Sequence, residues 1–361
     1  MKEGWEYKIF ESCLVKVPKQ VQIKSKDYKK EGKFPIVSQE AELISGYWDD
    51  ETIVYKHKEP VVIFGDHTKN IKYVDFNFVV GADGTHILST KKDINPKFFY
   101  YVLKSIKLRE LGYARHYKLL KEKYIPVPPL SEQQSIVDYL DSAFAKIDAM
   151  KANAEKALGE AKALFQASLK EMLEPKEGWE ENALKEICKV INGRAYSKDE
   201  MLKQGKYRLL RVGNFFTNDS WYYSDLELEE DKYCDNGDLL YAWSASFGPR
   251  IWDGEKVIYH YHIWKMVCSS MIDKYFLCYW LDSDELKKQT MTNLHGATMA
   301  HITKGIIEAA HVSFPSLPEQ QSIVATLDSL KSKVDHLQAN YEKISQECDA
   351  LKQALLRQVF E

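Results

Sequence analysis

The feature that most constrains this chain is a fourteen-residue segment that occurs twice. PPLSEQQSIVDYLD spans residues 128–141 and PSLPEQQSIVATLD spans residues 315–328, with ten of the fourteen positions identical. Identity at this level is typical of an internal duplication. In each copy a proline and a capping or acidic side chain come directly before an apolar run, which predicts that a helix begins in each segment.

Apolar residues within and after both copies recur at steps of three and four, the spacing of a heptad seam. The second seam consists of Ile323, Leu327, Leu330, Val334, Leu337, Tyr341, Ile344, Cys348, Leu351 and Leu355. The first consists of Ile136, Leu140, Ala143, Ile147, Met150, Ala154, Ala157, Ala161 and Leu164, widened by Phe165, Leu169, Met172 and Leu173. Roughly 40 helical residues span about 60 Å, more than the width of a small domain. We therefore expect the two helices to pack on each other as a coiled coil.

The duplication extends beyond the helices, because EGWE occurs at residues 3–6 and again at 177–180. The order is therefore domain, helix, domain, helix, and a chain that returns along its second helix needs an antiparallel pair. We expect a mixed α/β (α+β) fold with two globular domains separated by a long antiparallel coiled coil and a pseudo-two-fold internal repeat. The expected segments are a first domain at 1–127, a first helix at 128–175, a second domain at 176–314 and a second helix at 315–361.

The two domains have diverged in sequence but keep a common outline, with buried strands, polar loops and a capped aromatic helix in the same order. The predicted pairs are strands at 60–64 and 238–243, polar loops at 65–72 and 244–250, further strands at 73–80 and 257–267, and helices at 95–104 and 273–281. Different loops on a repeated scaffold are what two recognition surfaces for different targets would require.

The net charge of −3 does not by itself indicate a nucleic-acid-binding protein. Its distribution is more informative, since residues 1–131 carry a net charge of +6 and residues 176–318 carry −4. The first domain therefore favours phosphates through its overall field, whereas the second needs a local basic face.

Six cysteines lie far apart, with no CxxC pair. This pattern favours buried free thiols in a reducing compartment over disulfides or a zinc site. No run of 18 apolar residues occurs and no charged-then-apolar leader is visible at the N-terminus. We therefore expect a soluble, cytoplasmic protein.

At this point the residues match a known family. The P-x-L-x-EQQ-x-I-V segment, occurring twice and opening a coiled-coil helix after a variable aromatic-rich domain, resembles the specificity (S) subunit of type I restriction-modification systems. The loop sequences GDHT and AWSASFG are also similar to those of target recognition domains in this family. The resemblance implies a non-catalytic subunit with two target recognition domains. Each would read one half of a bipartite, asymmetric DNA site, and the helices would set the length of the unread gap.

The same resemblance implies the partners. Two modification (methyltransferase) subunits, which carry S-adenosylmethionine, would dock around the coiled coil, and restriction (motor and nuclease) subunits would join the larger complex. It implies no cofactor in this chain and no contact with a membrane. The residues that we assign to partner binding are those of the repeated EQQ triplet: Glu132, Gln133, Gln134, Glu319, Gln320 and Gln321.

Polar and basic side chains of the diverged loops are the candidates for DNA contact, because Arg and Lys address guanine edges or phosphates and Ser, Thr and His bond base edges or backbone. They are Lys69, Lys72, Arg115, His116 and Lys118 in the first domain and Arg194, Tyr196, Ser244, Ser246, Arg250, His295, Thr298 and His301 in the second. The alternative interpretation of each of them is an ordinary solvated loop residue. Trp221, Tyr222 and Tyr223 are expected to serve the core rather than to stack on bases.

Catalytic and metal-binding patterns are weak. The sequence has no nucleotide-binding glycine loop, and Asp225, Glu230 and Lys232 have a nuclease-like spacing within an acidic run that is more typical of a solvated turn. His260 and His262 alternate on a predicted strand, but two histidines without a third ligand favour packing over metal binding. We expect no catalytic and no metal residues. Two alternatives remain open: a coiled-coil scaffold that binds proteins through both domains, and a nuclease that uses the 225–232 cluster.

Overall fold

The computed structural model describes residues 4–82, 84–109, 112, 114–217, 219–244, 246–291 and 302–361. The chain divides into two compact units, which we call unit 1 (Met1–Glu155 with Tyr341–Glu361) and unit 2 (Lys156–Asn340). Each unit mixes helices and strands, so the mixed α+β fold expected from the sequence is confirmed. Within the described residues no helix is both long enough and apolar enough to cross a membrane.

The described residues of unit 1 form three sheets and two short α-helices before the first long helix. The elements are β1 (Glu6–Ile9), β2 (Leu14–Val15), β3 (Gln22–Ile23), β4 (Phe34–Val37), β5 (Gly46–Trp48), β6 (Val54–Tyr55), β7 (Val61–Gly65), β8 (Ile71–Val74), β9 (Phe78–Gly81), β10 (Thr85–Thr90), α1 (Pro96–Ser105), α2 (Tyr117–Lys121) and β11 (Tyr124–Val127). Short 3-10 turns lie at Phe10–Cys13, Ser25–Asp27 and Glu51–Ile53. The sheets have the orders β1-β11, β2-β10-β7-β8 and β3-β9-β4-β5, with β6 also pairing with β9.

Unit 2 also contains three sheets. Its elements are β12 (Glu180–Ala183), α4 (Leu184–Ile187), β13 (Cys188–Asn192), β14 (Tyr207–Leu210), α5 (Val212–Phe216), β15 (Tyr222–Ser224), β16 (Tyr233–Cys234), β17 (Leu239–Ser244), β18 (Ser246–Ile251), β19 (Val257–Tyr259), β20 (Ile263–Cys268), α6 (Lys274–Asp282), α7 (Asp284–Met291), α8 (Lys304–Glu308) and β21 (His311–Phe314). Its 3-10 turns are Lys198–Glu200 and Glu230–Lys232. The sheet orders are β12-β21, β13-β20-β17-β18 and β15-β14-β19-β16.

Two of the three sheets repeat between the units in the same strand order. The pair β1-β11 corresponds to β12-β21, and β2-β10-β7-β8 corresponds to β13-β20-β17-β18. The helix that follows the central sheet begins at a capping side chain in both units. Asn95 Oδ1 accepts from the N–H groups of Lys97 and Phe98, and Asp273 Oδ1 accepts from those of Tyr275 and Phe276. The internal repeat and both predicted caps are therefore confirmed.

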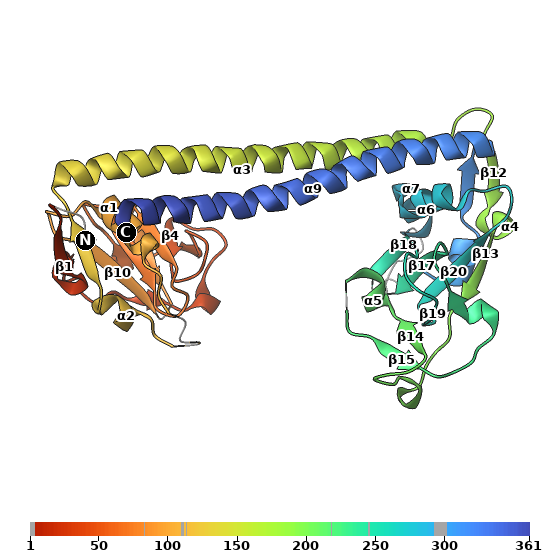
Figure 1. The fold of residues 1–361 in the computed structure, drawn as a ribbon, viewed down its shortest axis with the longest axis horizontal. Coiled ribbons are helices and arrows are strands. Elements are labelled where there is room, and N and C mark those ends of the chain that lie inside the picture. Colours follow the sequence, from red (N-terminus) through yellow and green to blue (C-terminus); the bar gives the residue numbers. More distant parts are fainter. Residues whose placement is uncertain are drawn as a thin grey trace. The chain divides into compact units, whose positions relative to one another are not determined.

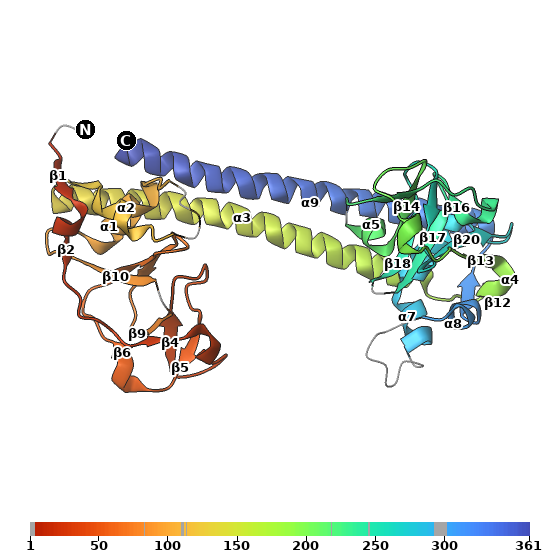
Figure 2. The same ribbon diagram turned by 90° about the horizontal axis from the view of Figure 1, so that it is seen from below.

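The two long helices are α3 (Leu130–Leu173) and α9 (Leu317–Phe360), each of 44 residues. Within unit 1 they run antiparallel: Asp148 on α3 pairs with Lys352 on α9, and one turn further along α3 Lys151 lies 3.9 Å from Asp349. Within unit 2, Lys162 Nζ donates to Gln338 Oε1 at 2.8 Å. In each unit the ribbon of α9 lies beside that of α3 (Figures 1 and 2).

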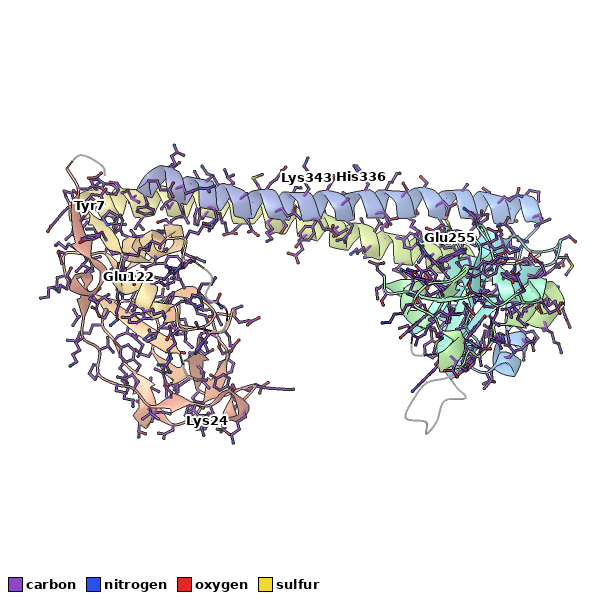
Figure 3. The ribbon with its side chains drawn as sticks, turned by 60° about the horizontal axis from the view of Figure 1, so that its bottom comes forward. Tyr7, Lys24, Glu122, Glu255, His336 and Lys343 are labelled. Atoms are coloured by element: carbon purple, nitrogen blue, oxygen red, sulfur yellow. The ribbon has the colours of Figure 1, made fainter. Side chains whose placement is uncertain are left out.

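Along most of α9 the residues predicted to form the apolar seam are the ones shielded from solvent. In α3 the shielded positions shift by one residue from the predicted ones. Met150, Ala157 and Leu164 are exposed, whereas the residues that follow them are less exposed: Leu158 is buried, and Lys151 and Phe165 are half-buried. On α9 the exception is Leu351, which is 47% exposed. His336 and Lys343 mark the solvent side of α9 in Figure 3. The shift arises because a straight helix of 3.6 residues per turn drifts from a strict seven-residue repeat.

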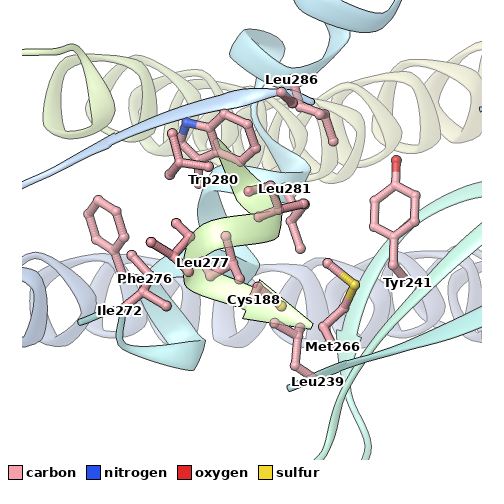
Figure 4. Packing of buried hydrophobic residues seen from close by; sticks show 14 of the residues in the cluster. Cys188, Leu239, Tyr241, Met266, Ile272, Phe276, Leu277, Trp280, Leu281 and Leu286 are labelled. Atoms are coloured by element: carbon pink, nitrogen blue, oxygen red, sulfur yellow. The ribbon is translucent and has the colours of Figure 1, made fainter. Parts of the chain in front are cut away.

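Both units place the N-terminal part of one long helix and the C-terminal part of the other in their cores. In unit 2, Leu169 and Leu173 of α3 and Leu327 of α9 join a cluster around Trp280, Phe276 and Leu277 (Figure 4). In unit 1, Val137 and Leu140 of α3 and Leu356 of α9 join a cluster around Phe98 and Phe99. The helix pair is thus part of the hydrophobic core at both places, which positions the loops of each unit against a rigid support.

Two of the predicted strands are each broken into two. Residues 73–80 contribute to β8 and β9, which lie in different sheets, and residues 257–267 contribute to β19 and β20, which also lie in different sheets. Continuous apolar character does not show where a chain turns from one sheet to the next.

Candidate nucleic-acid interface

The repeated EQQ triplet places one glutamine inside each unit. Gln133 and Gln320 are both 0% exposed. The amide of Gln133 accepts from Asn95 N–H at 2.8 Å and donates to the carbonyls of Asp93 and Pro128. Gln320 makes the same three bonds, to Asp273 N–H and the carbonyls of Met271 and Pro315. These two side chains fasten the long helix to the helix cap of its own unit, so the prediction that they face a partner is corrected to an internal role.

The other members of the triplet lie on the surface. Glu132, Gln134, Glu319 and Gln321 are exposed. In unit 1, Glu132 accepts from Trp5 Nε1 at 2.9 Å, and Gln134 accepts from Asn95 Nδ2 at 2.9 Å. These four residues are accessible to another protein in the way that the buried glutamines are not.

In unit 1 the polar loop between β7 and β8 forms a tight hairpin tip, residues 65–70. Lys69 has a positive φ of 60°, and its N–H donates to the Gly65 carbonyl at 2.8 Å. Gln39 braces the tip from the neighbouring sheet: its carbonyl accepts from Thr68 Oγ1 at 2.6 Å and Asn70 Nδ2 at 2.9 Å. A Cβ at Gly65 would collide with Thr68, so this turn needs glycine. The tip therefore presents its polar side chains on a fixed backbone.

His116 ties a second predicted segment to this tip. Its ring is buried, and its backbone N–H and Nδ1–H donate to the Asp66 carbonyl at 2.9 and 3.0 Å. The Asp66 carboxylate accepts from Tyr117 N–H at 2.7 Å and lies 3.3 Å from His86 Nε2. His116 therefore has an internal role: it connects its own segment to the hairpin tip. The exposed side chains on either side of this connection are Arg115 and Lys118.

Lys72 is not a surface cation. Its side chain is buried, and Nζ donates to the carbonyls of Ser38, at 2.8 Å, and Glu42. Burial lowers the pKa of this ammonium group, because charge is less favourable away from water. Lys72 fixes the 38–42 loop and has no exposed atom positioned for DNA, so its predicted contact is corrected.

Three predicted residues of unit 2 are engaged with other protein groups. Arg194 forms a two-bond pair with Glu200 at 2.6 and 3.0 Å and lies over Tyr196, which is itself buried. Arg250 donates to the Phe215 carbonyl at 2.9 Å and to Asp253 at 2.8 Å. Their guanidinium groups hold loops together within unit 2.

Unit 2 has a polar pocket of about 390 Å³ at one end of its sheets. It is lined by Arg211, Val212, Gly213, Asn214, Ser220, Tyr222, Ser244, His260 and His262. These come from the end of β14, α5, β15, the end of β17 and the β19–β20 connection. Ser244 belongs to the predicted DNA-contacting set, whereas Arg211, Asn214 and Ser220 do not. In the sequence, Arg211 directly follows the apolar pair Leu209-Leu210, which is buried at the end of β14. That position is the signal by which Arg211 could have been found.

His260 forms an isolated β-bridge with Arg194, and His262 lies in the turn between β19 and β20, which corrects the prediction of a shared strand face. Their ring centroids are nevertheless 4.8 Å apart. Burial, and then the nearby His262 and Arg211, lowers the pKa of His260 to about 4, so its imidazole is neutral at pH 7. Tyr222 is 38% exposed at the rim, which corrects the expectation that it serves the core.

The nuclease-like cluster does not converge on one point. Asp225 accepts from the Lys206 N–H at 2.7 Å, Glu230 pairs with Lys256 at 2.8 Å, and Lys232 pairs with Asp231 at 3.1 Å. In the part of the chain that the structure describes, no group of three or more His, Cys, Asp or Glu side chains is placed to hold a metal ion.

Two predicted residues are on a hairpin and three cannot be placed. Ser244 and Ser246 face each other across the tip of the β17–β18 hairpin, with Ser246 exposed. His295, Thr298 and His301 lie outside the described residues. The bonds between His116 and Asp66 therefore link the segment of Arg115 and Lys118 to the hairpin that carries Lys69 in unit 1. In unit 2, Ser244 lines a pocket with residues not predicted from the sequence.

Comparison with protein families identifies the repeated scaffold that carries these loops. The family model described as "Type I restriction modification DNA specificity domain" matches residues 3–158 and again residues 176–346. The two matches cover most of the chain and correspond to its two repeats. The chain therefore belongs to this family of type I restriction-modification specificity subunits.

Similar curated proteins carry the same description. The chain is 26% identical over 254 residues to the type I restriction enzyme MjaVIII specificity subunit of Methanocaldococcus jannaschii, a match that covers 63% of this chain and 60% of that protein. It is 24% identical over 308 residues to a putative type I restriction enzyme specificity subunit of Haemophilus influenzae, covering 77% and 76% of the two chains.

Solved structures support the fold over the full length. A chain from a study of assembly and conformational transition in the type I R-M system matches all of this chain and 98% of its own length, with a TM-score of 0.75 at 19% identity. The HsdS subunit from Thermoanaerobacter tengcongensis matches with a TM-score of 0.56, also at 19% identity, covering 100% of this chain and 97% of that one.

Proposed function

We propose that this chain is the DNA specificity subunit of a type I restriction-modification complex and that each unit reads one half of a bipartite, asymmetric site. The observation that carries the proposal is the contrast within the repeat. The frame is reproduced to the level of individual hydrogen bonds, at Gln133 and Gln320, while the exposed loops on that frame differ completely. Folding explains a repeated frame, and different loops suit two different targets.

The chemistry of the two surfaces supports DNA as the target. Unit 1 offers the exposed Arg115 and Lys118 beside the hairpin that carries Lys69, in a domain of net positive charge. Unit 2 is acidic overall, yet none of the described side chains that line its pocket is a carboxylate. Basic and neutral donors suit phosphates and base edges, which are rich in acceptors.

The long helices supply a ruler for the gap between the two half-sites. A helix of 44 residues spans about 66 Å, and half-sites one turn of DNA apart are separated by about 34 Å. A rigid spacer makes the second half-site available at high effective concentration only when the spacing fits. We place the recognition domains at residues 1–127 and 176–314, joined by the helices at 128–175 and 315–361.

The chain itself is non-catalytic in this proposal. Two modification subunits with S-adenosylmethionine would dock on the helix pair, and restriction subunits would join the complex. The exposed residues of the triplet, Glu132, Gln134, Glu319 and Gln321, are the docking candidates, because they are identical in the two copies although burial does not require it. Two copies of one surface suit two copies of one partner.

Co-expression with the modification subunit of the same host tests the proposal. We expect a stable complex, and we expect sequencing of cellular DNA to show methylated adenines in a split motif with a fixed gap. Lengthening α3 by one heptad should change that gap, and an unchanged gap would contradict the ruler. If no complex and no new methylation appear, a protein-binding scaffold becomes the better account.

A further inference from the structure

Arg211 occupies an unusual position among the arginines of unit 2. It directly follows β14 and occupies the N-cap position of α5, where its side chain makes no capping hydrogen bond. The side chain is exposed, and its guanidinium carbon lies 5.3 Å from the centre of the Tyr222 ring. Stacking on an aromatic face orients the planar guanidinium group. The side chain is thereby directed along the rim of the pocket that Arg211 and Tyr222 both line.

The other three arginines of unit 2 each have a carboxylate partner. Arg194 pairs with Glu200 at 2.6 Å, Arg208 with Glu255 at 3.2 Å and Arg250 with Asp253 at 2.8 Å. No described carboxylate lies within ion-pairing distance of Arg211. Its hydrogen-bond donors are therefore available to a ligand.

The surroundings of Arg211 are polar but otherwise carry little charge. The neighbouring pocket groups include the hydroxyl of Ser244, the amide of Asn214 and the imidazole of His260, whose pKa is lowered to about 4. A phosphate site usually gathers several cations. One arginine beside the uncharged groups of Ser244, Asn214 and His260 suits instead the edge of a base, where bonds are directional.

We propose that Arg211 is a specificity-determining residue that reads a guanine in the half-site recognised by unit 2. Guanine presents two acceptors, O6 and N7, on its major-groove edge, and an arginine fork can donate to both at once. This inference rests on the proposed function, because it requires that unit 2 read DNA.

The test uses the full-length chain in complex with its modification subunits. The methylated motif of the wild-type complex is mapped first, and a plasmid library then varies each position of both half-sites. For Arg211→Ala we expect the preference for guanine at one position of one half-site to fall by about tenfold to a hundredfold. The other half-site should be read unchanged. Arg211→Lys should restore charge without restoring the full preference, because lysine lacks the planar fork.

Arg208→Ala is the matched control. Arg208 lies on β14, three residues before Arg211, and its guanidinium carbon is 5.5 Å from the centre of the Trp221 ring, but it is paired with Glu255 (labelled in Figure 3) and does not line the pocket. We expect this variant to keep the wild-type motif. Co-purification of each variant with the modification subunits checks that unit 2 remains folded.

Two outcomes would overturn the assignment. An unchanged motif for Arg211→Ala would show that the side chain reads no base. Equal weakening on all sequences, with the slope of binding against salt reduced by about one and restored by Arg211→Lys, would show a phosphate contact. A wild-type complex that methylates no defined motif is a separate result, because it defeats the proposed function before Arg211 is tested.

Discussion

Units 1 and 2 share a frame and differ in the surfaces that the frame supports. The buried glutamine, the cap that it bonds and the central four-stranded sheet are the same in both. The remaining sheet is not: in unit 1 it is β3-β9-β4-β5 with β6, and in unit 2 it is β15-β14-β19-β16. The comparison teaches that the residues which attach a unit to the long helices can be kept while the recognition part changes.

The two units also differ in how they position their loops. Unit 1 braces its hairpin tip from within, through Gln39 and His116. Unit 2 leaves a pocket between its strands and commits three arginines to holding its loops. The same frame therefore supports a projecting tip in one unit and a concave surface in the other.

The largest expected effect is a loss of stability in unit 1, whose core includes residues from the C-terminal end of α9. Leu356 on α9 is buried among the residues of unit 1, far along the sequence from the rest of that unit. Leu356→Ala should lower the stability of unit 1 by about 2–5 kcal/mol through the lost packing and the cavity left behind. Hydrogen exchange should rise in unit 1 and not in unit 2. Leu351→Ala, at an exposed position of the same helix, is the control, and equal effects of the two variants would contradict the core described for unit 1.

Replacing either of the buried glutamines Gln133 and Gln320 should lower stability by a similar amount, but each replacement should affect only its own unit. Gln133→Leu and Gln320→Leu each leave one buried N–H and two carbonyls without their partner, at a cost of about 2–3 kcal/mol. Chemical denaturation followed by hydrogen exchange should show the loss in unit 1 for the first variant and in unit 2 for the second. Gln321→Leu changes an exposed neighbour and should have little effect. A stable Gln320→Leu protein would show that the buried glutamine is dispensable.

A smaller effect is expected at a tyrosine–aspartate pair that also repeats. Tyr101 donates to Asp141 in unit 1, and Tyr279 donates to Asp328 at 2.6 Å in unit 2. Tyr101→Phe and Tyr279→Phe should each cost about 1 kcal/mol. The loss should be larger at Tyr101, because that side chain is more buried. Tyr100→Phe, in the same helix as Tyr101, serves as the control in thermal unfolding, and a larger loss at Tyr279 would reverse the comparison.

The effect that is smallest at pH 7 is a pH dependence confined to unit 2, which becomes visible only in acid. The pKa of His260 is lowered from 6.5 to about 4, so the unfolded chain takes up a proton before the folded chain does. The contribution of the neutral imidazole to stability is therefore present above pH 6.5 and is lost as the pH falls toward 4. His260→Gln should flatten the pH dependence of unit 2 stability over this range. His336→Gln, at an exposed site on α9, should not, and identical profiles for His260→Gln and the wild type would contradict the burial of this ring.

Much of the frame could be predicted from the sequence because repetition and periodicity are local signals. The two helix starts, the caps at Asn95 and Asp273 and the buried strands β7 and β17 follow from spacing, capping chemistry and apolar runs. The heptad register of α3 after Met150 did not follow, since it depends on how a straight helix drifts against its partner.

The site was less predictable because polar residues look alike in sequence whether they face a ligand or another part of the protein. Lys72 and His116 have the chemistry of DNA contacts, yet one is bonded to buried carbonyls and the other to Asp66. Arg194 and Arg250 are held by Glu200 and Asp253, which lie six and three residues further along the chain, and the turns that bring each pair together were not predicted. Among the residues that the structure describes, no carboxylate lies within ion-pairing distance of Arg211, and no sequence pattern reports this difference from the other arginines of unit 2.

The central claim is that each unit reads its own half of the site, and a domain replacement tests it most directly. In the hybrid chain, residues 1–127 are copied in place of residues 176–314, and methylated sites are mapped after co-expression with the modification subunit. The account predicts a motif in which both halves carry the sequence read by unit 1, with the gap unchanged. A hybrid complex that still methylates the original asymmetric motif would show that the units do not read DNA separately.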